Sequence, residues 1–142
     1  MKKILSAIAF AICILSVNCC SAATLFQIYD NDPNYTLGAA YANARTYIEW
    51  RTITVVQYNP PHYQISARAV DVVYDYEANR TVAKKFFLEK RFNLDTKETF
   101  TRTDYGNWEK DEVVGDYTPS RQNRKIADIL FRAAYRMDFF GY

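Results

Sequence analysis

Cysteine is absent from the sequence after position 20. The three cysteines are Cys13, Cys19 and Cys20, all close to the amino terminus. A domain that begins after them has no disulfide, no thiol nucleophile and no thiolate ligand for a metal, even in a compartment where disulfides form. At about 120 residues, such a domain is still long enough to bury a core that folds without disulfides.

Histidine and glycine are also scarce. His62 is the only histidine, and its position beside Pro60 and Pro61 predicts a surface or packing role. One imidazole does not provide a pair of zinc ligands. The sequence contains no Gly-x-Ser-x-Gly elbow, no glycine-rich phosphate loop and no His-Glu-x-x-His motif. We therefore expect a protein that is not an enzyme and that has no metal and no cofactor.

Two carboxylate pairs are the remaining candidates for catalysis, because glycosidases work with two acids. They are Asp71 with Asp75 and Asp111 with Glu112. Asp71 lies where the alternation of apolar residues in a predicted strand breaks. A polar residue on a β-bulge accounts for that position, so we assign it no catalytic role.

The first 23 residues have the features of a secretory signal peptide. A basic start, Met1-Lys2-Lys3, precedes an apolar run from Ile4 to Val17, and small residues follow at Ser21-Ala22-Ala23. The apolar run is shorter than the roughly 20 residues that span a bilayer. We predict cleavage after Ala23, with no transmembrane segment in the chain that remains.

The predicted leader sets the compartment. Residues 24–142 then form a single exported domain, located in the periplasm, on the cell surface or in the medium. Lipid attachment at Cys19 or Cys20 is the alternative. The segment from Leu15 to Asn18 fits a lipoprotein signal poorly, because a small residue is wanted just before the cysteine.

Charge is balanced once the leader is set aside. Loss of Lys2 and Lys3 leaves 16 basic residues against 16 acidic ones, whereas a nucleic-acid binder keeps a basic excess. Acids concentrate between Asp104 and Asp116, and bases between Arg121 and Arg136. We expect these neighbouring segments to neutralise each other, and a dedicated face for an anionic ligand is the alternative.

Several strands are predicted from aromatic and β-branched residues. Residues 24–37 are expected to be an extended or poorly ordered lead-in. Strands follow at 45–50 and 52–58, and Asn59-Pro60-Pro61 ends the second. A long hairpin then runs over residues 63–92 with its turn at 77–80. Its apolar residues shift by one position near Ala69-Val70, which predicts a bulge there.

The rest of the chain is predicted to be a short strand pair and a helix. A strand over 98–105 with Phe100 inward follows a turn at 93–97, and a short strand surrounds Trp108. Thr118 is a suitable N-cap before Pro119. The helical spacing predicts a buried stripe of Ile126, Ile129, Leu130, Ala133 and Met137, with Gly141 just past the helix and Arg121, Lys125, Asp128 and Arg132 outward.

These elements predict an α+β fold: an antiparallel sheet of about five or six strands with one C-terminal helix packed on one face. Several short segments carry a resemblance to known proteins: Tyr47-Ile48-Glu49, the run from Val55 to Tyr63, Asp95-Thr96, Trp108 and the run from Ala134 to Tyr142. In these segments the chain resembles a group of small exported bacterial proteins of unassigned function. More distantly, the layout is similar to the surface-adhesin protein E family, whose members bind host matrix and serum proteins. The resemblance implies a protein-binding role.

Two protein-binding functions remain open. The first is an adhesin-like extracytoplasmic module that binds a protein through tyrosines on an exposed sheet face or edge, because tyrosine is enriched at interfaces. The second is a periplasmic structural or inhibitory protein that docks on an envelope protein through the basic face of its helix. Salt weakens only the second. The candidate binding residues are Tyr58, Tyr63, Tyr74 and Tyr76 for the first and Arg121, Arg124 and Arg132 for the second.

Overall fold

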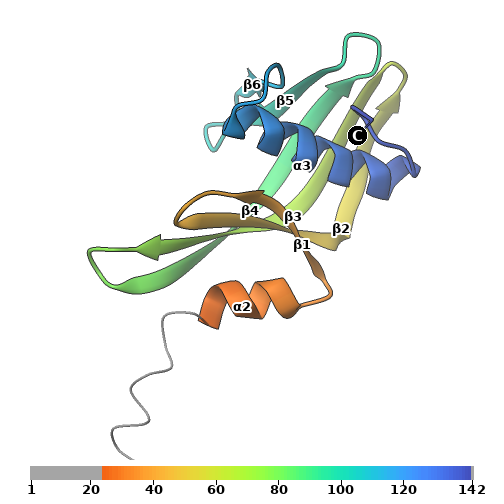
Figure 1. Ribbon diagram of the computed structural model, residues 1–142. Coiled ribbons are helices and arrows are strands. Elements are labelled where there is room, and N and C mark those ends of the chain that lie inside the picture. The colour runs from red at the N-terminus through yellow and green to blue at the C-terminus, as the bar shows by residue number, and fades with distance from the viewer. Residues whose placement is uncertain (1–23, 142) are drawn as a thin grey trace, which may run out of the picture.

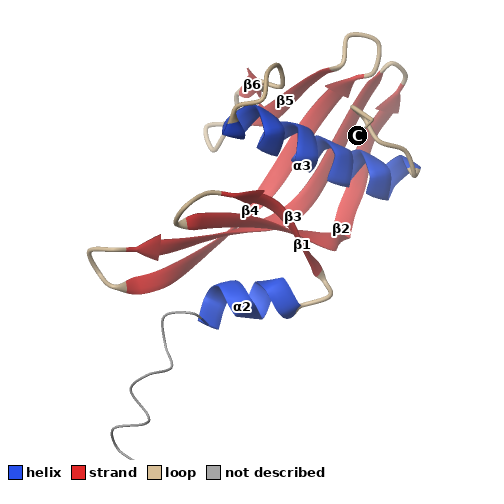
Figure 2. Cartoon of the chain, in the orientation of Figure 1, coloured by secondary structure: helices blue, strands red, loops and turns tan. Residues whose placement is uncertain are grey.

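The computed structural model describes residues 24–141 as two helices and one antiparallel sheet (Figures 1 and 2). The predicted leader lies outside the described residues. Strands that follow each other in sequence are neighbours in the sheet, in the order β1-β2-β3-β4-β5-β6. The predicted α+β fold with a C-terminal helix is confirmed. The elements are α2 (Thr24–Asn31), β1 (Tyr35–Ala40), β2 (Ala44–Asn59), β3 (His62–Asp75), β4 (Arg80–Asn93), β5 (Glu98–Arg102), β6 (Trp108–Lys110) and α3 (Thr118–Tyr135).

The two helices cover opposite faces of the sheet at opposite ends of the long strands (Figure 1). Ile65, Ala67 and Ala69 of β3 pack with α3 in the larger core. Val70 and Val72, whose side chains point to the other face, pack with α2 in a second core. Successive residues of a strand point to opposite faces, so a change of the covered face changes which positions are apolar.

This arrangement corrects the predicted bulge at Ala69-Val70. The pairing of β3 with β4 runs without a shift from His62 opposite Asn93 to Asp75 opposite Arg80. The one-residue slip in the sequence pattern therefore marks the point where the buried face changes. The strand itself stays regular.

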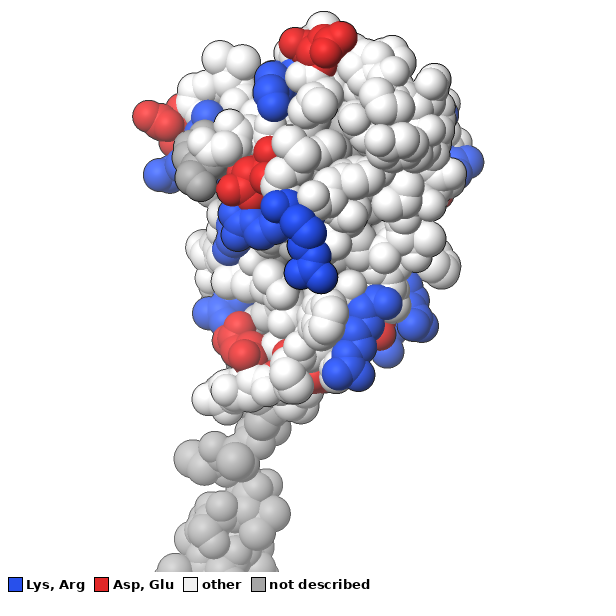
Figure 3. Space-filling model, turned by 90° about the vertical axis from the view of Figure 1, so that its right-hand side faces the viewer, with Lys and Arg blue, Asp and Glu red and all other residues white. Residues whose placement is uncertain are grey.

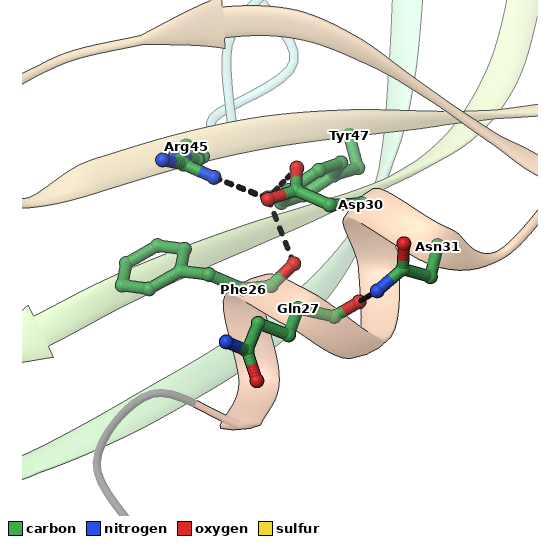
Figure 4. Close-up of polar contacts among 6 residues, drawn as sticks. All are labelled: Phe26, Gln27, Asp30, Asn31, Arg45 and Tyr47. Atoms are coloured by element: carbon green, nitrogen blue, oxygen red, sulfur yellow. Dashed lines mark hydrogen bonds and ion pairs between the residues drawn. The ribbon is translucent and has the colours of Figure 1, made fainter.

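The prediction of an extended lead-in over residues 24–37 is wrong, because this segment forms α2 and the start of β1. Figure 4 shows how α2 is held. The Asp30 carboxylate accepts a hydrogen bond from the Tyr47 hydroxyl at 2.8 Å and pairs with the Arg45 guanidinium at 2.5 Å. Arg45 also lies over the Phe26 ring, 5.0 Å from its centre. Leu25, Phe26 and Tyr29 then cover the second core.

The two strands predicted at 45–50 and 52–58 are one strand, β2, with two irregularities in its pairing. The register against β3 shifts between Val55 and Gln57 and, over a longer interval, between Glu49 and Thr54. Within this interval the Thr52 hydroxyl donates to the Glu49 carbonyl at 2.7 Å and accepts from the Arg68 amide at 2.8 Å. A threonine side chain thus replaces the missing backbone partner, and the strand continues.

Helix α3 begins one residue earlier than predicted. Its N-cap is Tyr117, which makes no side-chain capping bond, and Pro119 lies in the first turn. The helix ends at Tyr135, where Arg136 adopts the left-handed conformation and its amide bonds to the Arg132 carbonyl. A left-handed residue is a common helix terminator, although glycine usually supplies it.

The buried face of α3 is also rotated from the predicted stripe. Ala127, Leu130 and Phe131 are fully buried, whereas Ala133 and Met137 are exposed. Residues after α3 fold back, and Phe139 packs on Phe92 and Phe131 at ring separations of 5.1 and 5.2 Å.

Asp128, predicted to point outward, is buried with 6 % of its surface exposed. Its carboxylate accepts from the Phe140 amide at 2.8 Å. The returning tail changes which helix residues are covered, and helical spacing alone carries no information about that tail.

The side of strand β5 that is buried is the opposite of the predicted one. Thr99 is fully buried, while Phe100 is half-buried. On the same face as Thr99, the Lys90 ammonium donates to Thr101 at 2.7 Å and to Asp111 at 2.6 Å, and Thr101 donates to Asp111 at 2.7 Å. Burial lowers the pKa of Lys90, and the negative charge of Asp111 opposes that shift. The threonine positions thus face a buried ion pair.

We predict that Lys90→Met destabilises the fold by about 3 kcal/mol, because it leaves the Asp111 carboxylate buried without its cation. Lys90→Met combined with Asp111→Leu removes both charges and should cost clearly less than the single change. Urea unfolding monitored by circular dichroism measures both free energies. Equal losses in the single and the double variant would contradict a role for charge pairing.

We predict that Tyr47→Phe loosens α2 without disturbing the rest of the sheet. The change keeps the ring but removes the hydroxyl that binds Asp30, at a cost of about 1 kcal/mol. Hydrogen exchange should speed up at the amides of residues 25–31, while amides under α3 keep their protection. Unchanged exchange in α2 would show that apolar packing alone holds the helix.

Candidate functional site

The tyrosines predicted to form one binding face lie at two ends of the sheet. Tyr58 and Tyr63 face each other at the tip of the β2–β3 hairpin, whereas Tyr74 and Tyr76 lie at the far end of β3. At the rise of a strand this separation is roughly 35 Å. The four residues therefore do not form one surface.

Tyr63 is buried, with 9 % of its surface exposed, so the expectation of an exposed ring is wrong. It packs edge-on against Phe131 and Tyr135 of α3. Burial raises the pKa of Tyr135, and the neighbouring Tyr63 and Tyr58 raise it further. Tyr58 lies over this cluster and is 68 % exposed. Of the first tyrosine pair, only Tyr58 offers a large ring to a partner.

At the far end of β3, the exposed Tyr76 packs edge-on against Tyr74 at 4.9 Å. The Tyr74 hydroxyl donates a hydrogen bond to the Asn79 side chain in the adjoining turn. The Asp75 carboxylate accepts from the amides of Glu77 and Ala78 in the same turn. These contacts are those of a stable hairpin end.

The three predicted arginines do come together. Arg121, Arg124 and Arg132 line one hollow of about 430 Å³ on the outer side of α3, with Lys125, Ile129 and two acids, Asp116 and Asp128. Acids compensate part of the charge: Asp116 lies 3.6 Å from Arg124, and Asp138 lies 2.5 Å from Arg132. Figure 3 likewise shows positive and negative side chains intermingled on the face that it displays.

A different feature, which the sequence did not reveal, is the outer edge of β2. Strand β1 pairs with β2 only as far as Tyr35 opposite Glu49, and the Trp50 amide then donates to the Asn34 carbonyl at 3.1 Å. Within residues 24–141, no strand pairs with this edge beyond Trp50. We call the stretch Arg51–Asn59 the open edge of β2.

The open edge is uncharged over most of its length and carries exposed apolar side chains. Residues 52–58 read Thr-Ile-Thr-Val-Val-Gln-Tyr and contain no charged residue, proline or glycine. Val55, Val56 and Tyr58 are 39, 53 and 68 % exposed. Unpaired strand edges attract other strands, and native proteins usually guard them with lysine, proline or short length.

Other edges of the described sheet carry such guards. Beside β5, strand β4 pairs only over Lys90–Asn93, and its free stretch carries Lys84 and Lys85. Strand β6 has three residues, of which two are charged. The outer strand β1 has an irregular register at Gly38, and the Gln122 side chain from α3 donates to the Ala40 carbonyl at 3.0 Å. Within residues 52–58 the open edge of β2 carries no lysine and no proline, and its pairing with β3 shifts between Glu49 and Thr54 and between Val55 and Gln57.

A groove of about 520 Å³ adjoins the open edge on the α3 side. Helix α3 lies close against β1 at Gly38, where a side-chain carbon would approach Ile126 to 3.2 Å. The carboxyl-terminal half of α3 extends beyond the amino-terminal end of β1, and the groove lies beside this part of the helix. Thr36, Trp50 and Ile53 line it from the sheet, and Ile129, Arg132, Ala133 and Arg136 line it from the helix.

The carboxylates considered for catalysis have structural partners. Asp71 accepts from the Thr46 hydroxyl at 2.6 Å, and Asp111 is bound to Lys90 and Thr101. His62 is exposed and lines a hollow of about 490 Å³ on the sheet face opposite α3, beside Arg91 and Phe100. In the described part of the chain, no three metal-ligating side chains gather, and no helix there is long and apolar enough to cross a membrane.

The open edge could be predicted from the sequence only in part. The β-branched run over residues 52–58 predicts a strand, but which side of that strand stays unpaired depends on where β1 stops. Trp50, Ile53 and Ile129 carried no functional signal, because each is an ordinary apolar residue in its local pattern. Only their approach across α3 and β2 makes them one groove.

Comparison with family models, with curated proteins and with solved structures finds no match to this chain. The resemblance to small exported proteins and to the protein E family therefore stays a prediction.

Proposed function

We propose that this chain is an exported, non-enzymatic binding module that recognises a protein partner by strand addition at the open edge of β2. The observation that carries the proposal is the uncharged stretch of residues 52–58 on an edge without a described strand partner. In strand addition, main-chain hydrogen bonds supply affinity and side-chain pockets supply specificity. This mode needs no reactive group.

The surroundings of the open edge suit a partner protein. Trp50, Val56 and Tyr58 are 46, 53 and 68 % exposed, so a guest strand would cover large apolar surface while it completes the backbone pairing. Burial of such surface contributes about 25 cal/mol per Å². Aromatic residues at the ends of the edge match the composition of binding hot spots. The proposed binding surface for the adhesin-like function therefore still includes Tyr58, and it now also includes the open edge of β2.

We predict that Val56→Lys abolishes partner capture. A lysine on the open edge would have to lose its hydration beside an incoming strand, and a cost above about 1.4 kcal/mol already weakens binding tenfold. The matched control is Val82→Lys on the free stretch of β4, where valine is 43 % exposed. The measurement is a pull-down by the immobilised exported chain from host matrix and serum proteins and, separately, from solubilised envelope of the producing cell.

Capture that survives high salt, is lost in Val56→Lys and persists in Val82→Lys would support the proposal. Equal capture by both variants would contradict it, because binding would then not use the open edge. Circular dichroism of each variant checks that the sheet is intact.

A second candidate function is docking on an envelope protein through α3, as a periplasmic structural or inhibitory protein. The observation that favours it is the single hollow formed by Arg121, Arg124 and Arg132. Its lining contains four bases and two acids, so it keeps a positive excess. An acidic patch on the partner would fit it, and the interaction would depend on ionic strength.

For this second function we expect Arg121→Glu with Lys125→Glu to weaken envelope capture about tenfold, with stronger loss as salt shortens the Debye length from about 10 Å at 0.1 M to about 3 Å at 1 M. Both residues are exposed, so the fold should tolerate the change. Arg80→Glu with Lys85→Glu alters net charge equally at exposed positions far from the hollow. If this control pair loses capture to the same degree, only net charge matters and α3 is not the docking face.

A further inference from the structure

The amino-terminal end of β1 limits how a guest strand can lie on the open edge. The inference drawn from this limit rests on the function proposed above. Strand β1 runs antiparallel to β2 and begins beside Glu49 and Trp50. A guest strand on the same edge lies in line with β1. If it also pairs antiparallel, which is the commoner arrangement, its carboxyl-terminal end arrives at Trp50.

Strand β1 blocks the guest from continuing along the edge. The Asn34 carbonyl already accepts from the Trp50 amide, and Tyr35 already pairs with Glu49. A guest strand must therefore turn away or end at this point. A guest whose chain ends beside Trp50 needs no turn, and its terminal carboxylate then lies at this position.

Arginines surround the point where the guest ends. Arg132 and Arg136 line the groove, and no acid is among its lining residues. Arg51 is exposed and its guanidinium lies 5.5 Å from the centre of the Trp50 ring. Arg132 is paired with Asp138, whereas Arg51 and Arg136 have no acid within ion-pair distance among residues 24–141. Guanidinium groups bind carboxylates through paired, charge-assisted hydrogen bonds.

The groove also selects a side chain. Ile53 lies on the α3 side of β2, where it packs against the larger core, and alternate residues of a guest strand would point to that side. Near its end, one of them would meet Trp50, Ile53, Ile129 and Ala133. These surfaces are apolar and suit an aliphatic or aromatic side chain.

From this combination we infer that the guest is the carboxyl-terminal tail of a partner protein. It is an extended, apolar segment whose last residues place a side chain in the groove and whose free carboxylate binds Arg51 and Arg136. The open edge from Arg51 to Tyr58 accommodates a tail of about eight residues. An internal segment of a partner would lack the carboxylate and would meet β1 at its end.

The test uses random peptides of about eight residues, the length of the open edge, tethered by their amino ends in two matched sets. One set has free carboxyl termini and the other has terminal amides. The exported chain, fluorescently labelled, is applied to both. We expect at least about tenfold stronger retention on free acids, the size of one charge-assisted contact, with aliphatic or aromatic residues enriched among the last positions.

Arg51→Gln with Arg136→Gln should abolish the difference between acids and amides, while Lys84→Gln, an exposed lysine on β4, should leave it unchanged. Equal retention of acids and amides by the unaltered chain would overturn the inference. So would a preference for acids that survives in the arginine variant, or no retention of free acids. If peptides of both sets bind equally and Val56→Lys abolishes that binding, strand addition at the open edge is supported and recognition of a terminal carboxylate is contradicted.

Discussion

The central strand β3 buries one set of side chains under α3 and the alternate set under α2, and most of the architecture depends on this division. Ile65, Ala67 and Ala69 join the larger core, whereas Val70 and Val72 join the smaller one. A strand exposes its two faces alternately, so neither helix alone would bury both sets. Each helix covers only one end of the sheet. The long strands can therefore extend beyond their short neighbours β1 and β5, which leaves part of their edges without a strand partner.

Specific polar contacts fasten the covering elements to the sheet. Asp30 ties α2 to β2 through Tyr47 and Arg45. Lys90 ties β4 to Asp111, at the start of the segment that leads from β6 to α3. Lys90 and Asp111 are buried, and leaving either of them without its partner is costly, so this contact favours one docked arrangement over alternatives of similar apolar area. Asp128 does the same for the returning tail through the Phe140 amide. The position of α3, and with it the groove beside Trp50, follows from these constraints.

The predicted binding residues had different outcomes for identifiable reasons. Arg121, Arg124 and Arg132 lie on one helix, where their spacing fixes their common side, and the structure brings them to one hollow. The tyrosines lie on long strands, where short distances in sequence separate residues by many ångströms. Tyr63 points to the covered face and is buried, while Tyr58, its partner on the next strand, lies over it and stays exposed. Alternation alone does not tell which face of a strand a helix will cover.

Local patterns in the sequence were sufficient to predict strands in the chain after residue 45 and the terminal helix, because each depends on residues near one another in the chain. The turn at Pro60-Pro61 and the hairpin between β3 and β4 belong to this group. Tertiary structure alone decided that α2 exists as a docked helix, that Thr52 carries β2 across an irregularity, and that Lys90 is buried with Asp111. It also decided where β1 ends against β2, and so created the open edge. These features arise from contacts between residues far apart in sequence, whose strength depends on burial and geometry that no local pattern records.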